Sequence, residues 1–415
     1  MLLNAIYSCL LVMSSVIGAQ ETPVGETITR VYVTEYSGTN RPDIQDFNSS
    51  WVAFNVSTVD WDGSGSGAML SDEHATGDEA ADPVSPRWRW LMVTWSPWNA
   101  VQLGVAVVGV FGNALVIAVL FKRRAANRVT DTLVASLAAA DLLTSLFTVP
   151  VPRAVTMPTT WLGQLYCKMI HSSMLMWSNI GTSTYLLLAI SVERYLAVAH
   201  PMFFSLVLSR RQVHIAIAVI WIANYTISLS FGASSINVVE GVGTCTITFA
   251  STIGRLVSGY GLFIYRLLVP TLVMIVTQAL IIRKLYQQTA FFRSQKREGM
   301  QTSSSFHVTA RNRVLRLMMM VIITYVICWT PPQLMFLLYS LGIIPRWYPY
   351  SIYHRSLTLL GFCNSCANPI IYTIRFREFR EALVELFTGK AVKKPLFGTA
   401  SAASNGTNAR GTHDA

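Results

Sequence analysis

Seven long apolar runs constrain this sequence more than any other feature. They recur after Trp95 and occupy residues 98–121, 132–152, 166–199, 213–235, 258–286, 313–342 and 352–374. Each run is long enough to cross the hydrocarbon core of a bilayer, about 30 Å thick, as a helix. Membrane-spanning β-strands would be much shorter and would alternate in polarity, so helices are the only reasonable spans. The sequence therefore predicts an all-α membrane protein built as a seven-transmembrane helix bundle.

The distribution of charge predicts how the chain is oriented. Hydrophobic residues make up 52% of the 415 residues and charged residues 13%, whereas soluble proteins carry roughly a quarter of charged residues. The net charge of +11 does not indicate a nucleic-acid partner, because the basic residues gather in short loops on one face. With an odd number of runs, we expect an extracellular N-terminus and a cytoplasmic C-terminus in a multi-pass plasma-membrane protein. The basic loops lie at 122–128, 210–211, 283–316 and 375–380.

The segment before the first run divides in two. Residues 1–19 have an apolar centre and end in small residues, the pattern of a cleavable signal peptide, although an uncleaved apolar tail fits as well. Residues 20–95 are polar and acidic and bury too little apolar surface to fold alone, which predicts a disordered extracellular tail. Asn48 and Asn55 begin Asn-x-Ser triplets and are expected glycosylation sites if this tail is extracellular.

Two segments follow the transmembrane domain of residues 98–374. Residues 375–388 place Phe376, Phe379 and further apolar side chains on one side of a helix and charged side chains on the other. This pattern predicts a short amphipathic helix that lies on the inner leaflet of the membrane. Residues 389–415 are predicted to form a disordered cytoplasmic tail.

Polar side chains inside the apolar runs are costly, so function should be sought there, and Asp141 is the strongest case. Oxygen-rich groups around this carboxylate could hold a small hard cation with its waters. Interhelical hydrogen bonds without an ion are the alternative, and the spacing weighs the two about evenly. The other polar groups at comparable depth are Asn113, Asn179, Ser183, Asn364, Ser365 and Asn368.

Prolines interrupt three of the runs, at Pro270, at Pro331 with its neighbour Pro332, and at Pro369. Each proline removes a backbone hydrogen bond and bends its helix, which leaves a place where two arrangements can have similar energy. Trp329 lies just before one bend, so a ligand that presses on it could bias that bend. Static kinks are the alternative.

Two cysteines are expected to form a disulfide. Cys167 precedes Arg194 by 27 residues, about 40 Å of helix, which is nearly the thickness of a bilayer with its headgroups. Cys167 is therefore outside when Arg194 is inside. Cys245, in the outer loop between the fourth and fifth runs, is the other cysteine expected on that side of the mature chain. We predict that this bond joins the loop to the third helix.

Taken together, the motifs resemble those of the rhodopsin-like (class A) G-protein-coupled receptors over about residues 98–388. Any one match could be chance, but all of them occur in order, one for each span, followed by the trailing helix. The matches are GNALV with Asn113, LAAAD with Asp141, ERY at 193–195, Trp221, Pro270, CWTP at 328–331 and NPIIY at 368–372.

The resemblance implies a receptor and not an enzyme. An extracellular ligand would shift a pre-existing equilibrium toward a state whose cytoplasmic face accepts a heterotrimeric G protein. Glu193 would hold Arg194 in the inactive state, and Arg194 beside Tyr195 would be released to contact the G protein. Arrestin, receptor kinases and membrane lipids are the further partners that we expect.

The resemblance also implies an activation switch and an ion site. A sodium ion would favour the inactive state, and no other cofactor is expected. The switch residues would be Trp329, Pro331, Asn368, Pro369 and Tyr372. The sodium ligands would be Asp141, Asn179, Ser183, Asn364 and Ser365.

Three positions depart from the pattern of the family. Cys167 is about two residues further from Arg194 than is usual, so we expect the outer end of the third helix to be locally rewound. Gln278 stands where a tyrosine usually supports the active state. Arg311 stands where an acid would help to hold Arg194, which leaves Glu193 as the main restraint.

Two further residues argue against particular ligand classes. Met176 stands where amine receptors carry an aspartate, and Phe362 stands where opsins carry the lysine that binds retinal. The aromatic and amide lining and the acidic tail look most like those of neuropeptide receptors of the galanin, somatostatin and tachykinin kind. The candidate pocket consists of Met176, Tyr265, Arg266, Gln333, Phe336, Thr358 and Phe362.

Arg266 carries a charge within the outer half of a run. It would suit an anionic group of the ligand, unless its side chain extends to the outer headgroups. We expect a peptide ligand, and a receptor for a small anionic lipid or metabolite is the alternative. A membrane transporter is the alternative from another class, but the related halves and broken helices that mark many transporters are not visible.

Overall fold

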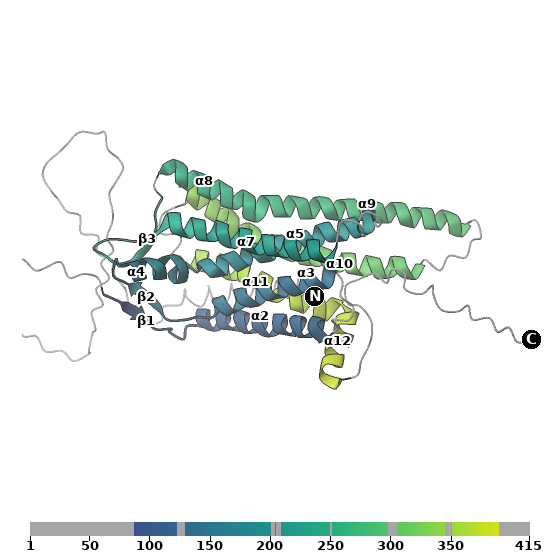
Figure 1. Ribbon diagram of the computed structural model, residues 1–415, viewed down its shortest axis with the longest axis horizontal. Helices are drawn as coiled ribbons and strands as arrows, with labels where there is room; N and C mark the ends of the chain where they lie inside the picture. Colours follow the sequence, from purple (N-terminus) through teal and green to yellow (C-terminus); the bar gives the residue numbers. More distant parts are fainter. Residues whose placement is uncertain are drawn as a thin grey trace, which may run out of the picture.

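The computed structural model describes residues 87–122, 129–200, 204, 209–249, 251–297, 305–344, 348 and 351–389. The predicted signal peptide, both glycosylation sites and most of the predicted extracellular tail lie outside these residues, as do residues 390–415. Seven helical segments are long and apolar enough to cross a membrane, and they lie side by side in one bundle (Figure 1). The predicted fold class is therefore confirmed.

The bundle is built from ten helices, two π-helical turns and two short antiparallel strand pairs within the described residues. The helices are α2 (Pro97–Lys122), α3 (Val129–Thr148), α4 (Trp161–Tyr166), α5 (Met174–Ala199), α7 (Arg210–Ser235), α8 (Thr252–Phe263), α9 (Val269–Arg297), α10 (Ser305–Ser340), α11 (Ile352–Arg375) and α12 (Arg377–Thr388). The π-helical turns are η2 (Cys167–His171) and η3 (Ile264–Leu268), and the strand pairs are β1 (Arg89–Leu91) with β2 (Arg153–Thr156) and β3 (Ile236–Val238) with β4 (Cys245–Ile247).

The helix bounds differ from the apolar runs at several ends: α9 continues to Arg297, past the predicted residue 286, and α10 begins at Ser305, before the predicted residue 313. The second run predicts a helix to residue 152, whereas α3 ends at Thr148. Pro150 and Pro152 explain the early end, because a residue before proline is driven out of the helical region and proline itself donates no hydrogen bond. The chain leaves the helix there and enters β2 instead.

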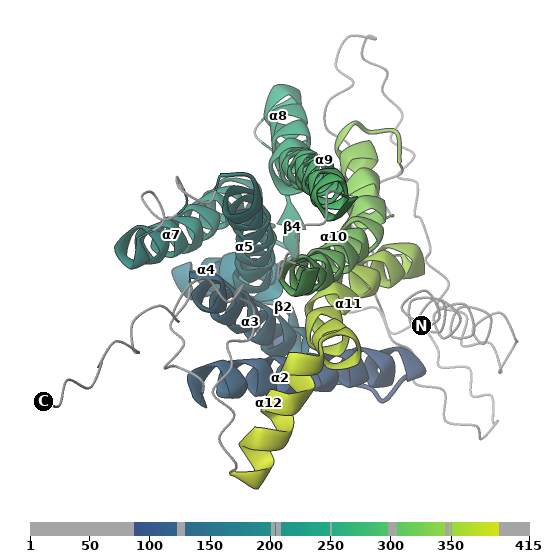
Figure 2. The same cartoon turned by 90° about the vertical axis from the view of Figure 1, so that its right-hand side faces the viewer.

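The third span lies at the centre of the bundle. It runs through α4, η2 and α5, and 67% of its most apolar window is buried, against 17% for α7. α5 packs against α3, α7 and α9 (Figure 2). Polar side chains on α5 can therefore reach several neighbouring helices, whereas most of α7 faces outward and its inner face alone meets the bundle.

The outer end of the third span is rewound, as the two extra residues before Arg194 predicted. The amide of Ser172 donates to the carbonyl of Cys167 five residues earlier, which is the hydrogen bond of a π-turn. Ser173 then takes a left-handed conformation, with φ at 56°, before α5 begins. A π-turn holds more residues than an α-turn, so η2 and the break after it absorb the extra length.

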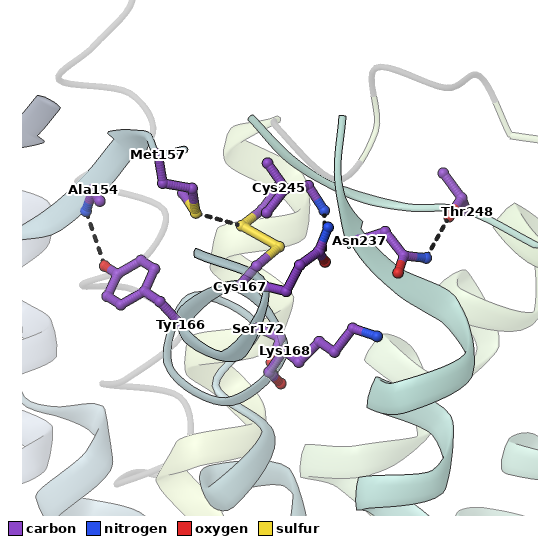
Figure 3. The surroundings of a disulfide bond; sticks show 11 residues. Ala154, Met157, Tyr166, Cys167, Lys168, Ser172, Asn237, Cys245 and Thr248 are labelled. Atoms are coloured by element: carbon purple, nitrogen blue, oxygen red, sulfur yellow. Dashed lines mark hydrogen bonds between the residues drawn. A yellow bond between two sulfur atoms is a disulfide. The ribbon is translucent and has the colours of Figure 1, made fainter. Parts of the chain in front are cut away.

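The two ends of the bundle differ, and each has a landmark. The predicted disulfide between Cys167 and Cys245 is present, with Cα atoms 5.6 Å apart, and it ties β4 to the start of η2 (Figure 3). We call this the disulfide end, and it also carries α4 and the strand pairs (Figure 1). The opposite end, where α5 finishes and α12 lies, we call the Arg194 end.

α12 is the predicted amphipathic helix, and it lies across the ends of α2 and α11 (Figure 2). Phe376 and Phe379 are fully buried against the bundle, whereas Phe387 is exposed. Lys122 Nζ donates to the carbonyls of Glu385 and Leu386, at 2.8 and 3.2 Å, which satisfies the C-terminal end of the helix. The apolar anchors and the lysine together fix the helix at the Arg194 end.

Gly181 is predicted to be essential for the packing of α5 against α7. A Cβ atom there would lie 2.4 Å from Oδ1 of Asn224, so Gly181→Ala displaces this side chain, which accepts a hydrogen bond from Tyr265, or moves the helices apart. We expect the free energy of unfolding to fall by about 1–3 kcal/mol. Gly104→Ala is the matched control, because nothing lies within 4 Å of its Cβ position. Melting temperatures of the two purified variants test this, and equal values would contradict the packing argument.

Candidate functional site

Glu193 and Arg194 form an ion pair that the bundle almost completely buries. Arg194 Nε lies 2.5 Å from Glu193 Oε2, and the two residues are only 7% and 2% exposed. Thr130 of α3 joins them, because its hydroxyl donates to Glu193 Oε1 at 2.9 Å and also contacts the guanidinium of Arg194. The pair is thus hydrogen-bonded to a neighbouring helix, and removing one partner would leave a buried charge uncompensated.

Three further residues were associated with this pair or with the active state in the sequence: Tyr195, Gln278 and Arg311. Tyr195 is half-buried, and its ring packs edge-on against His200. Arg311 lies in α10, but its side chain is outside the described part of the chain. Gln278 is buried, and neither its amide nitrogen nor its oxygen has a hydrogen-bond partner among the described residues.

Asp141 is the centre of a second polar cluster, midway along the bundle. Its carboxylate accepts from the Ser183 hydroxyl on one oxygen and from Nδ2 of Asn368 on the other, both at 2.8 Å. The side chain of Ser365 also contacts it. Asn364 and Asn368 each have a buried Oδ1 without a described hydrogen-bond partner. Carboxylate, hydroxyl and amide oxygens are the donors that a hard cation prefers, so this cluster fits a sodium ion.

Asn179 differs from the other residues predicted for the ion site. Its Oδ1 accepts a hydrogen bond from Tyr225 of α7, 2.8 Å away, so this oxygen is directed toward α7 and away from the carboxylate. Asn179 Nδ2 is buried without a partner in the described chain. The structure therefore brings Asp141 together with Ser183, Ser365 and Asn368, and engages the oxygen of Asn179 elsewhere.

Two of the prolines within the spans leave a backbone carbonyl without its helical hydrogen bond, and a side chain of another helix donates to that carbonyl. Pro270 cannot donate to the carbonyl of Arg266, and the hydroxyl of Tyr325 on α10 donates to that oxygen at 2.7 Å. Pro369 cannot donate to the carbonyl of Ser365, and Asn113 Nδ2 on α2 donates there at 2.9 Å. Each proline is thus a point where the helix is held by a neighbouring helix.

Trp329 lies two residues before Pro331, inside α10. It is 3% exposed, and its ring lies against Gly361 of α11, where a Cβ atom would come within 3.0 Å. Its other neighbour is Trp177 of α5, whose ring centroid lies 6.3 Å away in an edge-on contact. Because the two rings are in contact, a movement of Trp177 would displace Trp329 or change its packing.

Tyr372 is the last of the predicted switch residues, and it lies near the end of α11 at the Arg194 end. It is 2% exposed and its ring packs edge-on against Phe379, with centroids 6.0 Å apart. The end of α11 is in this way coupled to α12. Asn368 and Pro369, one turn earlier, connect the same helix to the Asp141 cluster and to Asn113.

Arg266 points into the bundle and does not extend to the headgroups. Its Nη2 donates to the hydroxyl of Ser228 on α7 at 3.1 Å, and its guanidinium lies over the ring of Trp177 at 5.5 Å. Tyr265 beside it stacks on Tyr185 and donates to Asn224. The η3 turn thus directs two consecutive side chains toward α5 and α7.

The remaining pocket residues lie on three helices. Met176 and Phe362 are buried in the same apolar cluster as Trp329. Gln333 and Phe336 belong to α10, on the disulfide side of Pro331, and Thr358 donates to the carbonyl of His354 within α11. Their membership in a ligand pocket stays a prediction.

Comparison with known proteins decides the family. Residues 112–372, well over half of the chain, match the model of the family described as 7 transmembrane receptor (rhodopsin family). The chain belongs to the rhodopsin family. It is a multi-pass membrane receptor that couples an extracellular ligand to G proteins, and it is not an enzyme.

Relatives of this receptor are found in vertebrates and insects. It is 27% identical over 290 residues to galanin receptor 2a of Danio rerio, which covers 68% of this chain and 76% of the relative. It is also 27% identical to galanin receptor type 2 of Rattus norvegicus, over 69% and 74% of the two chains. The allatostatin-A receptor of Bombyx mori is 25% identical, over 67% and 76%.

Four residues that complete these clusters were not predicted from the sequence: Thr130, Trp177, Tyr225 and Ser228. Thr130, Tyr225 and Ser228 carry ordinary hydroxyls, and a hydroxyl near a helix end or in an outward-facing helix gives no signal of its partner. Trp177 follows Met176 directly, so its place next to a predicted pocket residue was the one available clue. The partners of the three hydroxyls lie between 38 and 63 residues away in the sequence, and those of Trp177 lie further away still.

Proposed function

We propose that this receptor binds an extracellular peptide at the disulfide end and activates a heterotrimeric G protein at the Arg194 end. The observation that carries the ligand class is the set of relatives, because galanin receptors and an allatostatin-A receptor are receptors for neuropeptides. The pocket residues predicted from the sequence lie toward the disulfide end of their helices, and this end faces outward at the plasma membrane. Asn48 and Asn55 then carry glycans.

The signalling step rests on the buried cluster at the Arg194 end. While Glu193 and Thr130 hold Arg194, its guanidinium is engaged inside the bundle. Ligand binding favours the arrangement in which Arg194 is released, and the G protein is then contacted by Arg194 and Tyr195. The same face binds arrestin and receptor kinases, while α12 rests on membrane lipids through its exposed Val384 and Phe387.

A sodium ion stabilises the inactive arrangement at Asp141. The residues that would hold it are Asp141, Ser183, Asn364 and Ser365, with the oxygen of Asn368 completing the set. When bound, the ion supplies the positive charge that a buried carboxylate otherwise lacks. Asn179 contributes only if Tyr225 releases it.

Stimulation of nucleotide exchange tests the peptide function. The purified receptor is reconstituted with G proteins of several subtypes and exposed to a peptide-rich tissue extract before and after complete proteolysis. We expect the extract to stimulate exchange and proteolysis to abolish the stimulation. Stimulation that survives proteolysis would overturn the peptide ligand in favour of a small anionic lipid or metabolite.

Substitution of Glu193 tests the restraint on Arg194. Glu193→Gln removes the charge but keeps the shape, so Arg194 is held less tightly and basal exchange rises. We expect an increase of roughly two- to tenfold, the population change that about 0.4–1.4 kcal/mol produces. The control is Glu381→Gln, which removes an acid from the exposed pair with Arg377 and should leave basal exchange unchanged. Equal basal exchange in the two variants speaks against the restraint.

Thermal stability in sodium and in choline tests the ion site. At constant chloride, replacing sodium by choline should lower the Tm of the wild type, because an ion that binds only the folded state stabilises it by mass action. Asp141→Asn should make Tm insensitive to the exchange, while Asp131→Asn, on the first turn of the same helix, should preserve the difference. A sodium effect that persists in Asp141→Asn would exclude this site.

A further inference from the structure

Arg266 is a partly buried cation that has no counterion among the described residues. The carboxylates buried within these residues are Asp141, Glu193 and Glu385. Asp141 is engaged by Ser183 and Asn368, Glu193 is paired with Arg194, and Glu385 belongs to α12 at the far end of the bundle. The ion pairs of the described residues do not include Arg266. Within the described residues, its positive charge is therefore met by neutral groups alone.

Those neutral groups satisfy the guanidinium only in part. One nitrogen donates to Ser228, and the face of the group lies over Trp177. The Nε atom is buried and has no hydrogen-bond partner among the described residues. A guanidinium presents its donors in a planar fork that matches a carboxylate, so the unpaired Nε edge of this fork suits a carboxylate that enters the bundle.

The fork also faces the interior. Trp177, which lies under the guanidinium, contacts Trp329 of the neighbouring helix α10. Arg266 and Trp177 are only partly buried, although Ser228 and Met176 beside them are buried. Part of the surface of Arg266 and Trp177 therefore remains accessible to a bound group. A ligand group bound here would touch the ring that adjoins the Pro331 bend.

We propose that the guanidinium of Arg266, held between Ser228 and Trp177, binds a carboxylate of the activating ligand. This inference deepens the proposed function and rests on it for the identity of the ligand as a peptide. The carboxylate supplies the missing counterion, and it takes the donors that the protein leaves open. Its arrival changes the charge over Trp177, so recognition of the acid is coupled to Trp329.

Stability without any natural ligand gives the first test. An uncompensated charge in a bundle is destabilising, so Arg266→Met should have a Tm no lower than that of the wild type. If the arginine instead served to hold α7 and η3 together, the variant would melt lower and the proposal would fail. Arg255→Met, a charge removal on α8 of the same span, controls for the general effect of charge.

A small carboxylate gives the second test. N-acetylglycine carries the carboxylate of a peptide end, and N-acetylglycinamide is its neutral match at the same ionic strength. At about 100 mM, the acid should raise the Tm of the wild type and of Arg255→Met by roughly 1–2 °C over the amide. Arg266→Met should show no difference. A shift that is absent from the wild type, or equal in Arg266→Met, would overturn the carboxylate site.

The tissue extract separates this inference from the proposed function. Methyl esterification of its carboxyl groups should lower stimulation of the wild-type receptor roughly ten- to a hundredfold. Stimulation unaffected by esterification refutes the carboxylate site but leaves the peptide function standing. Conversely, stimulation that survives proteolysis and is lost on esterification refutes the peptide and keeps the site, for the anion of a lipid or metabolite.

Discussion

Every backbone polar group inside a bilayer needs a partner, because there is no water to supply one, and the bundle is organised around this requirement. The two prolines Pro270 and Pro369 illustrate this requirement. Pro270 and Pro369 each deprive a carbonyl of its helical donor, and Tyr325 and Asn113 donate to those oxygens from other helices. The bends are thus points where one helix is hydrogen-bonded to another, and a shift of either helix has to exchange these bonds.

The same requirement applies to charged side chains, with a larger penalty. Glu193 and Arg194 compensate each other, and Thr130 binds both. The carboxylate of Asp141 is contacted by Ser183, Asn368 and Ser365, and the amide oxygen of Asn368 has no partner in the described chain. Arg266 alone among these groups has neither an ion pair nor a full set of acceptors in the described chain. Asp141 and Arg266 are therefore the groups at which an ion or a ligand can supply the missing interaction.

Much of the fold could be predicted, because span length and polarity are local properties. The rewinding at η2 followed from comparing the Cys167–Arg194 spacing with the spacing usual in the family. The pairing of Cys167 with Cys245 followed from the side of the membrane expected for each. The end of α3 was missed because two prolines outweighed a run that remains apolar. The direction of Asn179 could not be predicted, since it depends on a tyrosine of α7.

The sequence by itself determined that the chain spans a membrane seven times, which side chains carry buried charge, and where the helices bend. These follow from hydropathy, from charge and from the chemistry of proline, all of which act within one segment. Only the tertiary structure decided that Thr130 completes the Arg194 pair, that Tyr225 engages Asn179, and that Trp177 connects Arg266 to Trp329. Partners of this kind are set by helix rotation and crossing, and packing between helices determines both.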